Sequence, residues 1–179
     1  LKPYLAIPSL KKYEVMTAKL NLSLAYTYLG EYNRAKPFLL EVLAETSPET
    51  ERLLYSNALR LMGCLELFRN DLPTALDYLG KAAQSLNQSS SLDHYLCRKW
   101  IAICQFMMSP KKADFREHLE EVRKEACQIQ HWESMRDIDF HLATTLKDKK
   151  MFQHLYCGTP ISNYRRRLLE AFGPAEIPT

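Results

Sequence analysis

An internal repeat of 40 residues constrains the fold of this chain more than any other feature of its sequence. When Gly30 is aligned with Asn70, the residues that follow match in kind at the same spacing. The matched pairs are Glu31 with Asp71, Tyr32 with Leu72, Ala35 with Ala75, Phe38 with Tyr78, Leu39 with Leu79 and Val42 with Ala82. Apolar residues recur at intervals of three and four in each copy, which is the period of an α-helix. The repeat therefore predicts stacked pairs of helices.

The scarcity of glycine supports the same conclusion. The chain of 179 residues holds 5 Gly, about 3% against the roughly 7% of average proteins. Hairpin turns and phosphate-binding loops depend on glycine, so a strand-rich or nucleotide-binding fold is disfavoured. Hydrophobic residues make up 46% and charged residues 25%, the balance of an ordinary globular protein. We therefore expect an all-α fold.

Helix start and stop signals divide the chain further. Ser47 and Pro48 are typical of a cap and a first helical turn, and Thr159 with Pro160 repeats the signal near the end. Gly173 is typical of the residue that ends a helix. A polar loop is expected over 87–91. The expected helices cover about 10–29, 32–45, 48–69, 72–86, 92–108, 112–129, 132–147, 149–156 and 160–172.

The two copies of the repeat resemble the tetratricopeptide repeat (TPR), a 34-residue pattern of two helices with small and bulky residues at fixed positions. The first copy supplies small Ser23, aromatic Tyr26 and Ala35 at matching positions. The second copy supplies small Gly63 but has Glu66 where the family has an aromatic residue. The resemblance implies a right-handed superhelix of antiparallel helix pairs.

The resemblance also sets the expected domain organisation. It is close in the first two copies and loose over 92–130, where Arg116 stands at a position at which the family has alanine. We expect about three TPR-like pairs over residues 1–130, the third degenerate, and capping helices with a tail over 131–179. Because the chain begins with Leu1 and not Met, we expect it to be a fragment of a longer protein.

A TPR stack binds extended peptides or partner helices on its concave face, so the resemblance implies a noncatalytic interaction module. Tyr28 and Phe68 suit an apolar anchor, and Arg60 suits a charge-assisted contact. Leu20 and Leu24 stand where receptors for chaperone tails have Lys and Asn, so that subclass is not expected. The alternative is that another helix simply packs here. The binding residues carried over from the family are Tyr28, Asn57, Arg60, Cys64, Phe68, Arg98 and Gln105.

A local excess of basic residues near the C-terminus offers a second function, nucleic-acid binding. The net charge of +3 is too small to indicate a general polyanion binder. The basic groups that could contact phosphates are Lys149, Lys150, Arg165, Arg166 and Arg167. Consecutive arginines fan around about 200° of a helix, so only part of them can face one surface. This geometry favours the alternative of solvated or salt-bridged arginines.

The same region resembles a segment of bacterial regulatory proteins that join TPR-like helices to a C-terminal DNA-binding region. The matching residues are Lys147 and Asp148, the Tyr-x-Gly-Thr-Pro run at 156–160, and Tyr164 with Arg165. No helix-turn-helix pattern accompanies them. The resemblance implies a regulatory parent protein, in which this chain is an interaction or sensing arm.

No catalytic, cofactor or metal site is expected. Asp137, Asp139 and His141 are close in sequence, but alternate residues point about 200° apart on a helix and cannot share a metal ion. No Walker lysine motif, Ser-His-Asp set or paired-His helix occurs. Trp100 and Trp132 occupy positions typical of a helical core, so we expect both to pack inside the protein.

The cysteines and the hydropathy pattern indicate the compartment. The five cysteines are odd in number and widely spaced, which disfavours a disulfide framework and favours a reducing compartment such as the cytoplasm. The longest uncharged runs, such as 100–110, fall short of the roughly 18 residues needed to cross a bilayer. The expected partner is a protein or peptide, and self-association remains open.

Overall fold

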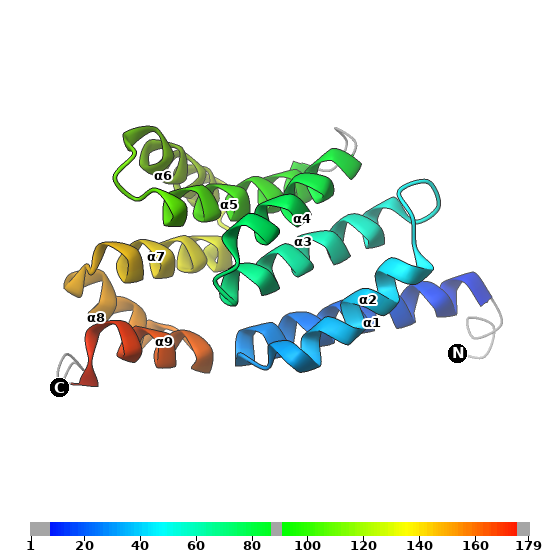
Figure 1. The fold of residues 1–179 in the computed structure, drawn as a ribbon, viewed down its shortest axis with the longest axis horizontal. Helices are drawn as coiled ribbons and strands as arrows, with labels where there is room; N and C mark the ends of the chain where they lie inside the picture. Colours follow the sequence, from blue (N-terminus) through cyan, green and yellow to red (C-terminus); the bar gives the residue numbers. More distant parts are fainter. Residues whose placement is uncertain (1–7, 87–90, 175–179) are drawn as a thin grey trace. The chain divides into compact units, whose positions relative to one another are not determined.

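A computed structural model describes residues 8–86 and 91–174. Over these ranges the chain is all-helical and contains no strand, which confirms the expected fold class. Figure 1 shows the elements. Of the loop expected over 87–91, residues 87–90 lie outside the described residues, and Ser91 begins a helix; residues 175–179 of the expected tail also lie outside them. The helices are α1 (Pro8–Leu29), α2 (Tyr32–Glu45), α3 (Arg52–Phe68), α4 (Leu72–Ser85), α5 (Ser91–Met108), α6 (Ala113–Gln128), α7 (Trp132–Leu146), α8 (Lys149–Gly158) and α9 (Ser162–Phe172).

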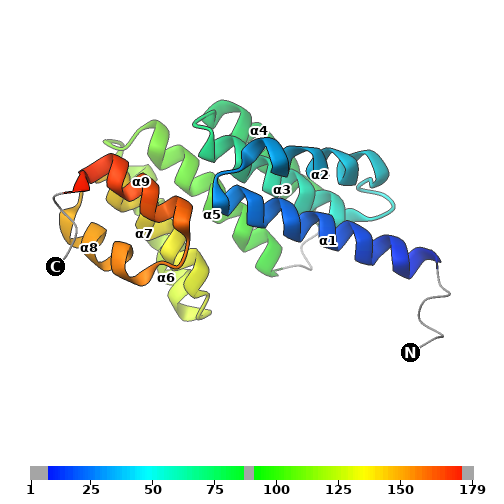
Figure 2. The same ribbon diagram turned by 90° about the horizontal axis from the view of Figure 1, so that it is seen from below.

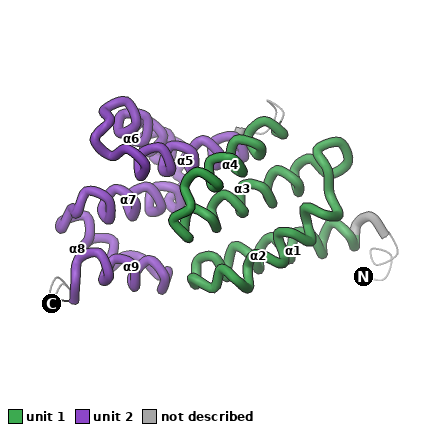
Figure 3. The backbone as a smooth tube through the Cα atoms, viewed as in Figure 1, with its two compact units in different colours: residues 1–90 green, residues 91–179 purple. Residues whose placement is uncertain are grey.

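The helices form two compact units, residues 1–90 and residues 91–179 (Figure 3). Unit 1 holds α1 to α4, and unit 2 holds α5 to α9. The pair that the sequence assigns to a third repeat, α5 and α6, therefore groups with the helices expected to form the cap. Inside unit 2, α7 contacts α5, α6, α8 and α9.

Unit 1 is built by successive packing of neighbouring helices. Each helix packs on the next one in the chain, and α1 also contacts α3; Figure 2 shows this unit from below. Apolar residues from the first three helices form one buried cluster between them. Its members are Met16, Leu20, Ala35, Leu39, Val42, Leu54, Ala58, Leu61, Met62 and Leu65.

The same left-handed turn occurs four times in the described ranges. Gly30, Asn70, Gln130 and Lys147 have φ angles of 81°, 67°, 56° and 58°. In each turn the following backbone N–H donates to a carbonyl five residues back, as from Glu31 to Tyr26 at 2.8 Å. This pattern satisfies carbonyls at the end of a helix and reverses the chain. The backbone thus confirms the alignment of Gly30 with Asn70, and it adds two further left-handed turns, at Gln130 and Lys147, that the sequence analysis did not identify.

Gly63 allows α3 and α4 to approach closely. A Cβ at this position would lie 2.5 Å from the Cγ of Leu79 and 3.1 Å from the carbonyl oxygen of Ala75. Both distances are shorter than a relaxed contact between such atoms. The small residue required by the repeat pattern therefore has a direct steric reason.

Glu66 occupies the position at which the repeat pattern has an aromatic residue. Its carboxylate is buried and pairs with the Nζ of Lys36 at 2.9 Å and with Nη1 of Arg69 at 3.5 Å. An ion pair between α2 and α3 thus replaces the expected ring packing. The carboxylate that departs from the pattern has cationic partners within unit 1, which a buried carboxylate requires.

Two predicted helix starts are wrong. The Ser47 hydroxyl accepts hydrogen bonds from the backbone of Glu49 and Thr50, but this caps only a short turn. Glu51, with φ −130° and ψ 57°, interrupts the helix, so α3 starts at Arg52. Likewise Thr159 donates its N–H to the carbonyl of Leu155 and ends α8. The last helix therefore starts two residues later than the sequence predicts, at Ser162.

A buried ion pair and a hydrogen bond to the same carboxylate join three helices of unit 2. The Nζ of Lys99 on α5 lies 2.6 Å from Oδ2 of Asp137 on α7, and both side chains are almost fully buried. The hydroxyl of Tyr164 on α9 donates to Oδ1 of the same carboxylate at 2.8 Å. The Tyr164 ring also stacks on Phe140, with centroids 4.0 Å apart. Asp137 on α7 therefore links this helix to both α5 and α9.

His141 lies one turn further along α7 and is also buried. Its ring stands edge-on to Trp100 and Phe140. Burial, together with the positive charges of Arg167 and Lys99, holds the pKa of His141 well below its ordinary value. The imidazole is therefore neutral at neutral pH, and it adds no third positive charge beside Lys99 and Arg167.

Replacing Gly63 with alanine is expected to lower the free energy of unfolding by about 1–3 kcal/mol, because the new methyl group overlaps Leu79. The matched control is Gly80→Ala, since a Cβ there meets nothing within 4 Å. Alanine favours a helix over glycine, so the control should be neutral or stabilising by up to about 1 kcal/mol. Urea denaturation followed by circular dichroism measures both, and equal stability of the two variants would contradict the close approach.

Removing one partner of the buried ion pair is expected to be costly. Lys99→Met or Asp137→Leu alone should each lower the stability by about 3–5 kcal/mol, because a buried charge is left without its partner. The double variant should lose less than the sum, with a coupling of about 1–3 kcal/mol. A double-mutant cycle by urea denaturation measures this, and strictly additive losses would show that the two charges do not interact.

Candidate functional site

Two of the seven residues expected to bind a partner are buried. Cys64 and Phe68 have almost no exposed surface. The Phe68 ring contacts Tyr28 edge to face, with centroids 6.3 Å apart. In this structure the two aromatic residues pack on each other, and Cys64 and Phe68 offer no accessible surface to a partner.

The other five predicted residues are more accessible and lie in different units. In unit 1, Arg60 donates to Oδ1 of Asn57 at 2.9 Å, and both side chains are half-buried. In unit 2, Arg98 is exposed and bonds to both carboxylate oxygens of Glu125 at 2.6 Å. Gln105, on the same helix, is half-buried. Their role in binding stays a prediction.

The basic residues near the C-terminus do not share one environment. Arg166 donates to Oδ1 of Asn163 at 2.8 Å and lies 3.7 Å from the carboxylate of Glu170. Arg167 is half-buried, with its guanidinium 5.9 Å from the centre of the Phe140 ring. The remaining three, Lys149, Lys150 and Arg165, are exposed. The arrangement favours arginines that serve packing and ion pairs within the fold.

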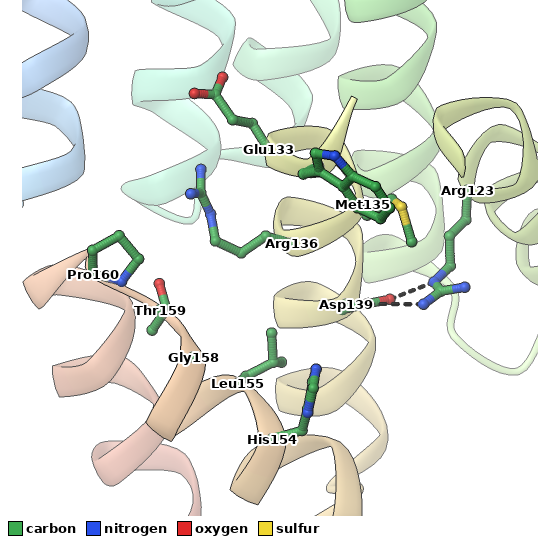
Figure 4. Close-up of a pocket in the computed structure, with 11 residues that line it drawn as sticks. Arg123, Glu133, Met135, Arg136, Asp139, His154, Leu155, Gly158, Thr159 and Pro160 are labelled. Carbon is green, nitrogen blue, oxygen red and sulfur yellow. Dashed lines mark hydrogen bonds and ion pairs between the residues drawn. The ribbon is translucent and has the colours of Figure 1, made fainter. Parts of the chain in front are cut away.

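A hollow of about 390 Å³ opens in unit 2 between α6, α7 and the end of α8. Figure 4 shows its side chains. We call it the α7 hollow, because five of its residues come from that helix. Its lining residues are Arg123, Trp132, Glu133, Met135, Arg136, Asp139, His154, Leu155, Gly158, Thr159 and Pro160.

One side of the α7 hollow is a fixed ion pair. Arg123 on α6 binds both carboxylate oxygens of Asp139 on α7, at 2.5 and 2.9 Å (Figure 4). The hydrogen bond to Asp139 is the main cause that raises the pKa of Arg123 above its ordinary value. The forked geometry fixes both side chains, and the two opposite charges cancel. This side is therefore rigid and carries no net charge.

The other side presents Arg136. Figure 4 shows Arg136 and Glu133 projecting from α7 away from the Arg123 pair. The Nε atom of Arg136 is buried, and no hydrogen-bond acceptor among the described residues satisfies it. The nearest carboxylate is Asp137, 3.7 Å from Nη2, which already binds Lys99 at 2.6 Å. One carboxylate thus serves two cations, so Arg136 is only partly paired within the fold, and the exposed Glu133 is the other charged side chain on this side.

Trp132 lies at the mouth of the α7 hollow. It is 65% exposed, so the prediction that it packs in the core is wrong, whereas the same prediction for Trp100 is confirmed. The turn at Gln130 places Trp132 at the first position of α7, and His131 caps the helix by accepting from the N–H of Ser134. An exposed indole beside an arginine is a pairing enriched at the energetic centres of protein interfaces.

The sequence analysis identified only one part of the α7 hollow. The Tyr-x-Gly-Thr-Pro run contributes Gly158, Thr159 and Pro160 to the lining. Arg123 and Asp139 come together from different helices, so no local spacing in the sequence predicts that they form an ion pair. The exposure of Trp132 could have been predicted, because the first residue of a helix has fewer neighbours than the residues within it.

Comparison with protein-family models, curated protein sequences and solved structures gives no match for this chain. No group of three or more His, Cys, Asp or Glu side chains in the described part of the chain could hold a metal ion. Asp137 and Asp139 instead face different cations, Lys99 and Arg123. None of the helices within 8–86 and 91–174 is long and apolar enough to cross a bilayer.

The two tryptophans should differ sharply in access to solvent. Acrylamide is expected to quench mainly the fluorescence of Trp132, because Trp100 is buried. Trp132→Phe should remove most of the quenching, and Trp100→Phe should leave it nearly intact. Stern–Volmer analysis of the two variants measures this. If the single tryptophan of the Trp132→Phe protein were quenched as strongly as the wild type, the exposed position of Trp132 would be refuted.

Proposed function

We propose that this chain is a noncatalytic protein-interaction module with TPR-like helical repeats, and that the α7 hollow binds an acidic segment of a partner protein. The observation that carries this proposal is Arg136, whose Nε–H is buried at the hollow without an acceptor among the described residues. A buried donor without a partner is costly, and a carboxylate that enters the hollow and binds the Arg136 guanidinium would offset this cost.

The lining suits a carboxylate with an apolar neighbour. A carboxylate can bind Arg136 from outside, because the charge of Asp137 is already shared with Lys99. Trp132 and Met135 offer apolar surface next to it. The neutral Arg123–Asp139 pair provides a rigid wall that needs no further partner. A peptide bearing Asp or Glu beside a large apolar side chain fits this combination.

The helix arrangement supports the TPR-like architecture on which the proposal draws. In each unit the helices contact their successors, and α1 with α3 and α5 with α7 also contact across one intervening helix. This is how stacked helix pairs are connected. The parent protein we infer is a cytoplasmic regulator of bacterial type. The cysteines, all five of which lie in the described ranges, form no disulfide, which agrees with a reducing compartment.

Nucleic-acid binding receives less support. Phosphate contacts need cations that are available on one surface. Arg166 and Arg167 are engaged with Asn163, Glu170 and Phe140 of their own unit. The protein-interaction function is therefore the one we carry forward.

Selection of random peptides displayed on phage tests the proposal, since the probe need not be known in advance. Selected peptides should combine Asp or Glu with a neighbouring apolar residue. Their affinity should fall about tenfold or more for Arg136→Gln and for Trp132→Ala, because both side chains would contact the peptide. Isothermal titration of the strongest peptide gives the affinities.

The control for this experiment is Arg116→Gln, which changes an exposed arginine of α6 outside the α7 hollow. This variant should bind the selected peptides as tightly as the wild type. Selected peptides that carry net positive charge, or that bind Arg136→Gln as tightly as the wild type, would overturn the proposed site.

A further inference from the structure

Helix α1 presents an exposed apolar stripe with coiled-coil spacing. Val15, Leu22 and Leu29 are 43%, 46% and 50% exposed, and Ala18 and Ala25 between them are also exposed. The intervals are three, four, three and four residues, which correspond to positions a and d of a heptad. We call these five residues the α1 stripe. It runs for about 21 Å, from 14 steps of about 1.5 Å.

The internal repeat shows what this face of a helix does elsewhere in the chain. Adding 40 to Ala18, Leu22 and Ala25 gives Ala58, Met62 and Leu65 on α3. All three α3 residues are fully buried, in the same cluster as Ala35, Leu39 and Val42 of α2. On α3, then, the three central positions belong to the core shared with the preceding helices, while the end positions, Tyr55 and Arg69, are half-buried and exposed, respectively. On α1 the same surface is exposed, although its composition is that of a helix-packing face.

We propose that the α1 stripe pairs with the α1 stripe of a second copy of this chain, with the two helices antiparallel. In an antiparallel pair each a position lies opposite a d position. Leu22 then lies opposite Ala18 of the second copy, and Val15 opposite Ala25. Every large residue of the central layers meets a small one, and the two-fold axis makes each contact occur twice. The four residues Val15, Ala18, Leu22 and Ala25 are therefore complementary in shape to those of the second copy, while Leu29 lies at the edge of the interface, opposite Lys11.

The polar residues beside the α1 stripe permit this pairing. Asn21 flanks the stripe near its centre and meets Asn21 of the second copy, so two amides lie side by side. Lys19 on the opposite flank meets its own counterpart, but each lysine is already paired within its own chain. Its Nζ lies 3.0 Å from a carboxylate oxygen of Glu41 and 3.4 Å from one of Glu45. The like charges at the axis are thus neutralised before association.

The α1 stripe is short, so the association should be weak and dependent on concentration. Two heptads bury less surface than a permanent dimer requires, and a dissociation constant on the order of 10 µM is expected. The α1 stripe and the α7 hollow share no residue, so variants of the stripe test this proposal separately from the function proposed above.

Sedimentation equilibrium of the full chain tests the proposal. The average mass should rise from that of a monomer toward that of a dimer between about 1 and 100 µM. Leu22→Glu should abolish the rise, because two carboxylates would meet apolar surface at the centre of the interface. Leu40→Glu, a change at an equally exposed leucine of α2, should leave the rise intact. A monomer mass at every concentration would overturn the proposal.

Disulfide trapping tests the antiparallel arrangement directly. In a chain carrying Cys127→Ser and Cys157→Ser, which removes the two exposed thiols, Asn21→Cys should oxidise rapidly to a covalent dimer. Asn33→Cys, at an exposed position of α2, should remain monomeric under the same conditions. Equal trapping of both variants, larger oligomers, or a dimer that traps neither would each overturn the arrangement.

Discussion

The ion pair between Lys99 and Asp137 is the interaction on which unit 2 depends. Two buried charges would each be costly alone, so α5 and α7 must meet at this point. Tyr164 then adds α9 to the same carboxylate. With α7 fixed in rotation, Arg136 and Asp139 are directed to opposite sides of the hollow beside it. The candidate site is thus a consequence of how one helix is anchored.

The helical fold could be predicted because its signals are local. The three- and four-residue periodicity gave the nine helices within the described ranges to within a few residues at most ends. Gly30 and Asn70 were identified because glycine and asparagine are typical of left-handed turns. Gln130 and Lys147 adopt the same conformation, but neither residue type is typical there, so the sequence predicted a helix boundary near each without revealing its left-handed backbone. Pattern reasoning recognises such a turn only when the residue type reveals it.

Most of the candidate site could not be predicted from the sequence, because its residues meet only through tertiary packing. Arg123 and Asp139 meet only after α6 and α7 have packed, and Lys99 and Asp137 are 38 positions apart. Positions carried over from the repeat family gave Cys64 and Phe68 as binding residues, yet both are buried. A repeat pattern defines which residues share a face of a helix, but it does not define which faces remain open.

Glu66 has a consequence for how the repeats recognise one another. Helix pairs with purely apolar seams are interchangeable, because any such seam accepts any other. The pair between Lys36 and Glu66 makes the seam between α2 and α3 selective, since a wrong neighbour would leave the buried carboxylate without its lysine. A single charged residue in place of a ring thereby makes the packing of α3 on α2 specific within unit 1.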